Sequence, residues 1–332
     1  MPKQHQAVDM TQGDPLGLLV RFSLPLLAGN AFQQLYNMVD TIIVGRFVGA
    51  GALAAVGSTG TIMFLTTGFA QGVSSGFSVI VSQKYGAKDP DGVKASVANG
   101  ILLSIISSIL MTVFCLVIMH PLLVLMNTPS DIFDNAYTYI MVISIGISAN
   151  VFYNLFSAYL RAVGNSQIPL FFLIFSACLN VVLDLLLIVT FRMGVAGAAW
   201  ATITAQAVSG ILCLLYMKKK FTILKMNDDE WRPDAHYMKI LCNMGIPMGL
   251  QYSITAIGSV ILQTAVNSLG SMAVAAVTAG SKISMFFCCP FDALGSTMAT
   301  FGGQNVGARK LDRIDQGLKA GAVMGCVYAV IA

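Results

Sequence analysis

Residues 95–119 read ASVANGILLSIISSILMTVFCLVIM, a run of 25 residues without a charged side chain. A bilayer core needs about 20 consecutive apolar residues when the chain crosses it as a helix. The run is therefore long enough to cross a membrane once. Because its apolar residues are continuous rather than alternating, the pattern favours a helix over a strand of a membrane β-barrel.

The composition of the whole chain agrees with this interpretation. Of 332 residues, 56% are hydrophobic and 10% are charged, whereas a soluble domain usually has about 25% charged residues. The mean hydropathy is +0.76. So few charges cannot coat a soluble globule of this length, which argues against a soluble enzyme and makes the bilayer the expected solvent. The polar start, 1–14, has no short apolar core followed by a small-residue cleavage site, so we expect no signal peptide.

Several kinds of site have no support in the sequence. The seven cysteines lie in apolar stretches and form no CxxC pair, and the three histidines are scattered. Neither a disulfide framework nor a zinc site is therefore expected. A dense basic face with interleaved aromatic residues is missing, which argues against a nucleic-acid partner. We expect no cofactor and no resident metal.

Eight further stretches of the chain are apolar over a similar length to 95–119, and we call all nine stretches windows. The sequence therefore predicts an all-α polytopic membrane protein with about nine membrane-spanning helices. The nine windows are roughly 18–43, 52–80, 95–119, 135–159, 168–190, 195–217, 238–266, 272–300 and 316–332.

The positive charges indicate the orientation of these helices. Loops on the cytoplasmic side of a membrane carry an excess of Lys and Arg. If the N-terminus is cytoplasmic, 16 of the 19 Lys and Arg residues fall inside, including those at 84–94, 218–239 and 309–313. Only Arg46 and Arg192 fall outside. The sequence therefore predicts a multi-pass protein of the plasma membrane with a cytoplasmic N-terminus.

Two blocks of sequence recur at one offset of 221 residues. VGAGALAAVGSTG (48–60) aligns with LGSMAVAAVTAGS (269–281), and SQKYGAKDPDGVKASVANG (82–100) aligns with GQNVGARKLDRIDQGLKAG (303–321). A repeat of six helices has the same orientation in both copies, because six is even. The pattern predicts two parallel repeats related by an axis along the membrane normal, with a cavity between them.

The repeat divides the chain into three parts. We expect a six-helix N-terminal lobe at 1–217, a polar cytoplasmic linker at 218–237, and about three helices of a C-terminal lobe at 238–332. A second lobe equal to the first would need three more helices beyond Ala332. The repeat therefore predicts that the chain holds about nine of twelve helices, as a C-terminally truncated protein would.

Three carboxylates, Asp40, Asp184 and Asp292, lie well inside apolar windows. A charge at the bilayer centre costs at least about 2.5–3.5 kcal/mol, so such groups normally face a cavity or a partner. Asp292 has no stripe of polar residues beside it, and a functional and a purely structural role are equally open for it.

The other two carboxylates, Asp40 and Asp184, have polar residues beside them in the sequence. The residues that share a helical face with Asp40, at spacings of three and four, are Gln33, Tyr36 and Asn37. Asn180 lies one turn before Asp184, and Thr202 lies in GVAGAAWAT, a small-residue run in which backbones can approach closely. Two nearby carboxylates can share one proton, or they can hold Na⁺ transiently together with oxygens of Asn and Thr. The alternative is that each Asp only hydrogen-bonds a neighbouring helix.

Five segments resemble the multidrug and toxic compound extrusion (MATE) family of transporters, most closely its DinF-type branch. They keep their order along nearly the whole chain and read FSLPLLAGNAFQQLYNMVDTIIVGRFVGAGALAAVG (22–57), QKYGAKD (83–89), YLRAVGNSQIP (159–169), LNVVLDLLLI (179–188) and GGQNVGARK (302–310).

This resemblance implies twelve helices in two six-helix lobes and export driven by H⁺ or Na⁺. It also implies a cation- or proton-binding site, whose residues are here Asp40, Asn180, Asp184 and Thr202. Tyr36, Tyr139 and Asn154 match further cavity-lining positions. The helical face shared with Asp40 adds Asn37, and Asp292 is added as a carboxylate inside an apolar window. Another branch of the family has an acidic site in the seventh helix, but 238–266 contains no Asp or Glu.

The favoured function is a cation-coupled antiporter that exports organic, often cationic or amphipathic, compounds by alternating access. The alternative is a flippase for lipid-linked sugars or polysaccharides from the same superfamily, although the spans offer few Lys or Arg for a phosphate. An intramembrane aspartyl protease is disfavoured because Asp184 stands in VVLDLLL rather than in a GxGD motif. We therefore predict a transporter rather than an enzyme, and a monomer whose partners are the bilayer and small organic molecules.

Overall fold

The computed structural model describes residues 8–126, 128–224, 231–267 and 271–332, and every regular element in these ranges is a helix. In chain order the helices are α1 (Pro15–Phe47), α2 (Ala50–Gly86), α3 (Pro90–Leu125), α4 (Ser130–Ile145), α5 (Ile147–Ala162), α6 (Gln167–Asp184), the π-helix η1 (Leu185–Thr190), α7 (Gly194–Lys220), the 3₁₀ turn η2 (Thr222–Leu224), α8 (Ala235–Asn267), α9 (Ser271–Gly307) and α10 (Leu311–Ile331). The predicted all-α class is confirmed. Lys3, Lys225 and positions 269–270 of the second repeat block lie outside the described residues.

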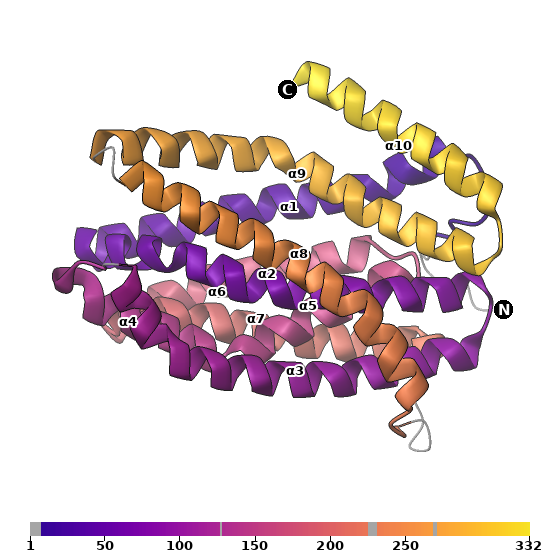
Figure 1. Ribbon diagram of the computed structural model, residues 1–332. Coiled ribbons are helices and arrows are strands. Elements are labelled where there is room, and N and C mark those ends of the chain that lie inside the picture. Colours follow the sequence, from indigo (N-terminus) through magenta and orange to yellow (C-terminus); the bar gives the residue numbers. More distant parts are fainter. Residues whose placement is uncertain (1–7, 127, 225–230, 268–270) are drawn as a thin grey trace.

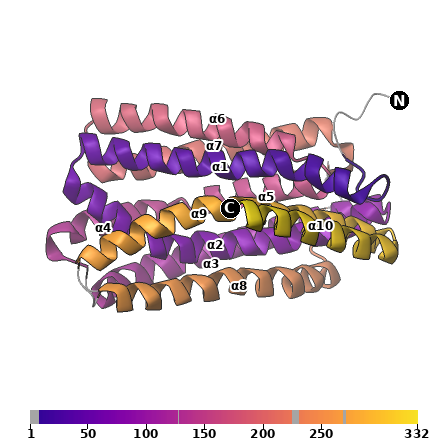
Figure 2. The same cartoon turned by 90° about the horizontal axis from the view of Figure 1, so that it is seen from above.

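The long helices run back and forth along one direction, with their connections at two ends (Figure 1). The N-terminal segment, the α2–α3 turn and the α9–α10 turn lie together at one end, which we call the N-terminal end. Seen from above, α8 lies on the opposite side of the bundle from α6, with α2 between them (Figure 2). The turns at the N-terminal end belong to the connections that the sequence predicts to be cytoplasmic.

Six helices of the described residues are long and apolar enough to cross a membrane, or seven if α4 and α5 count as one span. The predicted window 135–159 is not one helix, because α4 and α5 are bent by 49° relative to each other. The break lies at Gly146, where a side chain would clash with Ile203 of α7. α8 and α9 coincide with the windows 238–266 and 272–300 but are not among the six, so a count of nine spans stays a prediction.

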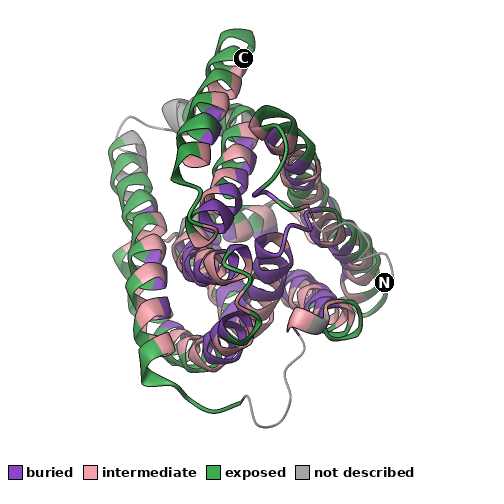
Figure 3. Ribbon diagram, turned by 90° about the vertical axis from the view of Figure 1, so that its right-hand side faces the viewer, coloured by how far each residue is buried: buried purple, intermediate pink, exposed green. Residues whose placement is uncertain are grey.

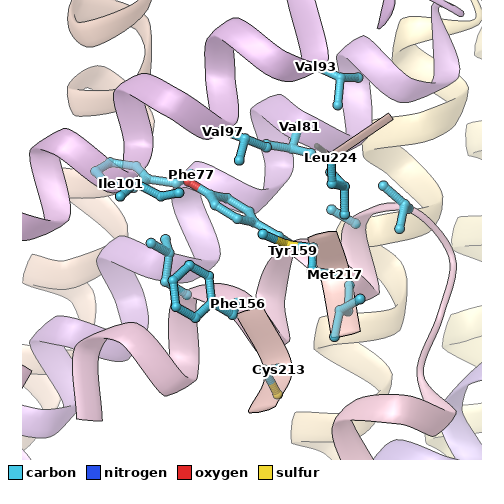
Figure 4. Packing of buried hydrophobic residues seen from close by; sticks show 14 of the residues in the cluster. Phe77, Val81, Val93, Val97, Ile101, Phe156, Tyr159, Cys213, Met217 and Leu224 are labelled. Atoms are coloured by element: carbon cyan, nitrogen blue, oxygen red, sulfur yellow. The ribbon is translucent and has the colours of Figure 1, made fainter. Parts of the chain in front are cut away.

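The outside of the bundle is apolar, as a surface in contact with lipid must be. Buried residues face the interior of the bundle and exposed ones face outward (Figure 3). On α3, Leu110 and Val117 are 64% and 69% exposed. Inside, a cluster of apolar side chains around Phe77, Tyr159 and Met217 joins α2, α5 and α7 near the N-terminal end (Figure 4). The chain is therefore a helical membrane protein, as predicted.

The two turns that the repeat predicts to be equivalent have the same geometry. Lys88 after α2 and Arg309 after α9 both adopt φ of 57°. The N–H group of each donates to the carbonyl three residues earlier, at 3.0 Å in both turns. A left-handed conformation costs a non-glycine residue about 1–2 kcal/mol, so finding it at both matched positions supports the repeat. Superposition of 238–332 on 18–119, and the division into lobes, stay predictions.

Glycines allow α8 to contact α2 through its backbone. A Cβ atom on Gly72 would lie 2.5 Å from the carbonyl oxygen of Met248, and one on Gly76 would lie 2.5 Å from the Cα of Gly245. In membranes, small residues are the usual means by which helices come this close. The first six windows and the later helices thus share an interface along α2.

The contact between α2 and α9 at the N-terminal end is reciprocal. A Cβ atom on Gly86 would clash with the carbonyl of Gln304, and one on Gly307 would clash with the carbonyl of Gln83. The repeat pairs Gln83 with Gln304 and Gly86 with Gly307. The two helix ends therefore meet as the halves of a pseudo-two-fold contact.

The segment before α1, residues 8–14, joins both halves at this end, and we call it the N-terminal strap. The N–H of buried Met10 donates to Gln304 Oε1 at 3.0 Å, and its carbonyl accepts from Asn305 Nδ2 at 3.0 Å. The N–H of Val8 donates to the carbonyl of Gly164, between α5 and α6, at 2.8 Å. The strap therefore connects the α5–α6 turn to the end of α9.

Candidate functional site

A cavity of about 250 Å³ lies among α1, α2, α4, α5, α6 and α7. The predicted residues that line it are Tyr36, Asp40, Tyr139, Asn154 and Thr202. Asn180 and Asp184 are buried beside it, with 1% and 0% of their surfaces exposed. We call this space the N-lobe cavity.

The carboxyl groups of Asp40 and Asp184 lie within hydrogen-bonding reach of each other, although they come from α1 and from the end of α6. Such a pair can be joined by one shared proton, with the protonated carboxyl as donor. The structure therefore brings together the two carboxylates that the sequence predicts to meet.

Asn180 connects Asp184 to α7. With its amide group in the orientation that satisfies both ends, its Nδ2 donates to Asp184 Oδ2 at 3.1 Å and its oxygen accepts from the N–H of Thr202 at 3.1 Å. The hydroxyl of Thr202 donates to the carbonyl of Ala198 at 3.1 Å, one turn earlier in α7. The amide thus fixes the position of the Asp184 carboxyl relative to two helices.

Phenol groups cover the pair. The Tyr36 hydroxyl lies within hydrogen-bonding reach of the Thr202 side chain. The ring of Tyr139 is buried, and its hydroxyl is close enough to interact electrostatically with Asp40 and Asp184. Two phenol groups therefore lie near the carboxyl pair, and the Asn180 amide contacts Asp184.

One oxygen of each carboxyl, Asp40 Oδ1 and Asp184 Oδ1, is buried without a hydrogen-bond partner. Neither carboxyl forms a salt bridge with a described residue. Buried anions without a partner are costly. A proton or a cation between the two carboxyls would satisfy these oxygens.

The helix changes its pitch directly after Asp184. The next six residues form the π-helix η1, with Ile188 as its buried residue. Single π turns within helices occur frequently at functional sites. The sequence contains no signal for this feature, since LLLIVT (185–190) reads as an ordinary apolar helix.

The structure separates two predicted residues from the pair. Asn37 is exposed on the outside of α1 and does not line the N-lobe cavity, because one residue along a helix turns the side chain by about 100° from Tyr36. Asp292 lines another cavity, of about 160 Å³, formed by α2, α5, α8 and α9. We call it the interlobe cavity.

Arg161 is a residue that sequence reasoning missed. The predicted window 135–159 ends before it, which makes it a loop cation, but the structure places it in the last turn of α5, where it lines both cavities. Tyr153 and Ser157, at spacings of four before it, line the N-lobe cavity as well. This regular spacing of polar residues was the available signal that one face of α5 points inward.

Comparison with known proteins gives consistent matches. A family model described as MatE matches residues 25–186 and 247–332. Over 313 residues the chain is 33% identical to the Bacillus subtilis (strain 168) protein named probable multidrug resistance protein YpnP, covering 93% of this chain and 69% of that protein. It is 27% identical over 307 residues to probable multidrug resistance protein YoeA of the same organism, covering 90% and 66%. The chain thus spans about two thirds of the length of these curated relatives.

The fold has a close match among solved structures. A MOP superfamily transporter from Pyrococcus furiosus superposes with a TM-score of 0.91 at 25% sequence identity, covering 97% of this chain and 72% of that one.

Proposed function

The chain belongs to the MatE family, and from this membership we infer that it takes part in exporting small organic compounds across the cytoplasmic membrane, coupled to H⁺ or Na⁺. Both curated relatives described above are named as probable multidrug resistance proteins, which supports organic compounds as cargo. Their names do not favour the flippase alternative. The DinF-type branch stays a prediction.

The observation that carries the coupling proposal is the carboxyl pair Asp40–Asp184. Two negative charges held this close in a poorly screened interior repel each other strongly. A proton or Na⁺ that enters the N-lobe cavity removes the repulsion and occupies the two unpaired oxygens. The Thr202 hydroxyl adds a neutral oxygen atom that suits either ion, and the Asn180 amide holds Asp184 in place.

Ion binding can change the shape of the cavity through α1. Asp40 lies on this helix, and Pro25, which removes one backbone hydrogen bond from the helix interior, lies on the same helix and lines the same cavity. Proline positions are where helices bend. Pulling Asp40 toward Asp184 would therefore move the α1 wall and expel a bound organic molecule.

Alternating access requires the N-terminal end, which we place in the cytoplasm, to open and close. In this structure it is closed by the reciprocal contact of α2 with α9 and by the N-terminal strap. These are the contacts that must separate before a compound can enter from the cytoplasm.

The test is gradient-driven transport by the full-length protein in proteoliposomes. We expect a pH gradient or a Na⁺ gradient to drive movement of a fluorescent organic cation, and the ion that succeeds identifies the coupling. Asp40→Asn and Asp184→Asn preserve size but remove the ionisable group. Each should reduce gradient-driven transport to background.

Asp131→Asn is the matched control, because Asp131 lies in the first turn of α4, away from both cavities. It should transport as the wild type does. If both Asp40→Asn and Asp184→Asn keep normal gradient-driven transport while membrane insertion is unchanged, the carboxyl pair is structural and the coupling proposal is wrong.

A further inference from the structure

Arg161 lies where the two cavities approach each other. It is the one residue that lines both the N-lobe cavity and the interlobe cavity among the described residues. The neighbouring carbonyl of Ala162 accepts hydrogen bonds from Ser82 Oγ at 3.3 Å and Gln304 Nε2 at 2.9 Å. The end of α5 is therefore held between both halves of the protein, and the guanidinium is placed at their junction.

The guanidinium of Arg161 has no anionic partner within the described part of the chain. The groups that interact with it electrostatically are Tyr153, Cys213 and Tyr252, all of types that are neutral near pH 7. It forms no salt bridge there, and no hydrogen bond from its side chain is found.

An arginine in such a place needs an explanation. Its guanidinium stays charged and offers five donors in a rigid planar fork. Ionisable residues within membrane segments are costly and normally pair with an opposite charge or face a water-filled pathway. Because no carboxylate of the described residues pairs with the guanidinium, a molecule in the cavity can supply the counter-charge.

The interlobe cavity carries one charge of each sign. Asp292 of α9 lines it together with Arg161 of α5, and Tyr252 of α8, which interacts electrostatically with both, lies on its wall. The two charges do not form a salt bridge with each other. A ligand that has both a negative and a positive group can therefore contact both residues, whereas a simple cation meets repulsion from Arg161.

We propose that Arg161 is the anion-binding residue of the transport pathway and that the substrates include organic zwitterions, whose carboxylate binds the Arg161 guanidinium while their cationic part faces Asp292. This rests on the proposed export function and names its substrate class. A carboxylate matches the guanidinium fork with two parallel hydrogen bonds. Asp40 and Asp184 remain free for the coupling ion.

The experiment uses a pair of fluorescent dyes that differ in one group. Rhodamine 110 carries a free carboxylate beside its cationic ring system, and rhodamine 123 is its methyl ester. Binding of each dye to the purified full-length protein in detergent is measured by fluorescence anisotropy. The wild type should bind the acid about 10- to 100-fold more tightly than the ester, the range of one charged hydrogen-bonded contact.

In Arg161→Gln this ratio should fall to about one, while ester binding changes by no more than about twofold. Arg161→Lys keeps the charge but loses the planar fork, and its ratio should lie between those of the wild type and Arg161→Gln. Arg46→Gln is the control, because it removes an exposed arginine from the last turn of α1. It should keep the wild-type ratio.

The proposal is overturned if the wild type does not prefer the acid, or if Arg161→Gln weakens the acid and the ester equally. The wild-type ratio and Arg161→Lys still decide the question if Arg161→Gln does not fold. Gradient-driven transport of rhodamine 123 by the wild type is measured in parallel. Its absence would count against the export function, separately from the carboxylate preference.

Discussion

At the level of single residues, the position of the Asp184 carboxyl depends on Asn180. This amide donates to Asp184 Oδ2 and accepts from the N–H of Thr202. Asn180→Ala would leave the buried Oδ2 of Asp184 without its amide donor, which costs about 1–3 kcal/mol. We expect the purified variant to unfold at a lower temperature than the wild type and to lose most gradient-driven transport.

The matched control is Asn37→Ala, which removes an exposed amide from α1. It should leave both the unfolding temperature and transport unchanged. A wild-type unfolding temperature in Asn180→Ala would show that the amide does not hold the Asp184 carboxyl in place.

Residue spacing predicted part of this site and missed another part. The spacing of four residues predicts that Asn180 shares a helix face with Asp184, and Tyr36 with Asp40. In the structure Tyr36 and Asp40 line the N-lobe cavity, and Asn180 and Asp184 are buried beside it. Arg161 was missed because a cation near the end of an apolar window reads as a loop residue. The spacing of Tyr153, Ser157 and Arg161 indicates an inward face of α5, and the packing of α5 between the two halves places Arg161 on both cavities.

At the level of elements, the N-terminal strap depends on α9 for its place. Gln304 uses both ends of its amide, accepting from the N–H of Met10 at 3.0 Å and donating to the carbonyl of Ala162 at 2.9 Å. Gln304→Ala removes both bonds and should weaken closure of the N-terminal end by about 1–2 kcal/mol. We expect a cysteine at buried Ser82, in a background without native cysteines, to react with a maleimide roughly five to thirty times faster.

Gln316→Ala is the control for this measurement, since Gln316 is exposed on α10. It should leave the labelling rate at Ser82→Cys unchanged. Equal labelling rates in Gln304→Ala and the parent would mean that the strap does not contribute to closure.

Two features of the elements could not be predicted from the chain alone. The bend lies at Gly146, where Ile203 of α7 occupies the space that a side chain would take. The π-helix after Asp184 occupies a run whose composition fits an ordinary helix. Hydropathy locates the apolar windows well because a helix in contact with lipid must be apolar. It does not show where a helix bends, because bends depend on how the helices pack together.

At the level of the whole molecule, the internal repeat was visible in the sequence because both copies must make the same turn. Lys88 and Arg309 keep the left-handed conformation at matched positions. The matched glycines before them, Gly86 and Gly307, make the reciprocal contact. What the repeat could not predict is that the two copies touch each other there, since an offset in sequence does not give a distance in space.

This contact yields a test of alternating access. A methyl group on Gly307 would clash with the backbone of Gln83, which cannot rotate away as a side chain could. Gly307→Ala should therefore prevent close approach of α2 and α9, at a cost of about 1–3 kcal/mol. Because closing the N-terminal end is one half of the proposed cycle, we expect gradient-driven transport to fall strongly while labelling at Ser82→Cys rises.

Gly302→Ala separates this effect from helix propensity. Gly302 lies in the same helix, and a Cβ atom there would meet nothing within 4 Å. Alanine is better than glycine within a helix by about 0.5–1 kcal/mol, so this variant should be slightly more stable and transport normally. If Gly307→Ala also transports normally, the two helix ends do not need their close contact, and closure of the N-terminal end must depend on the strap instead.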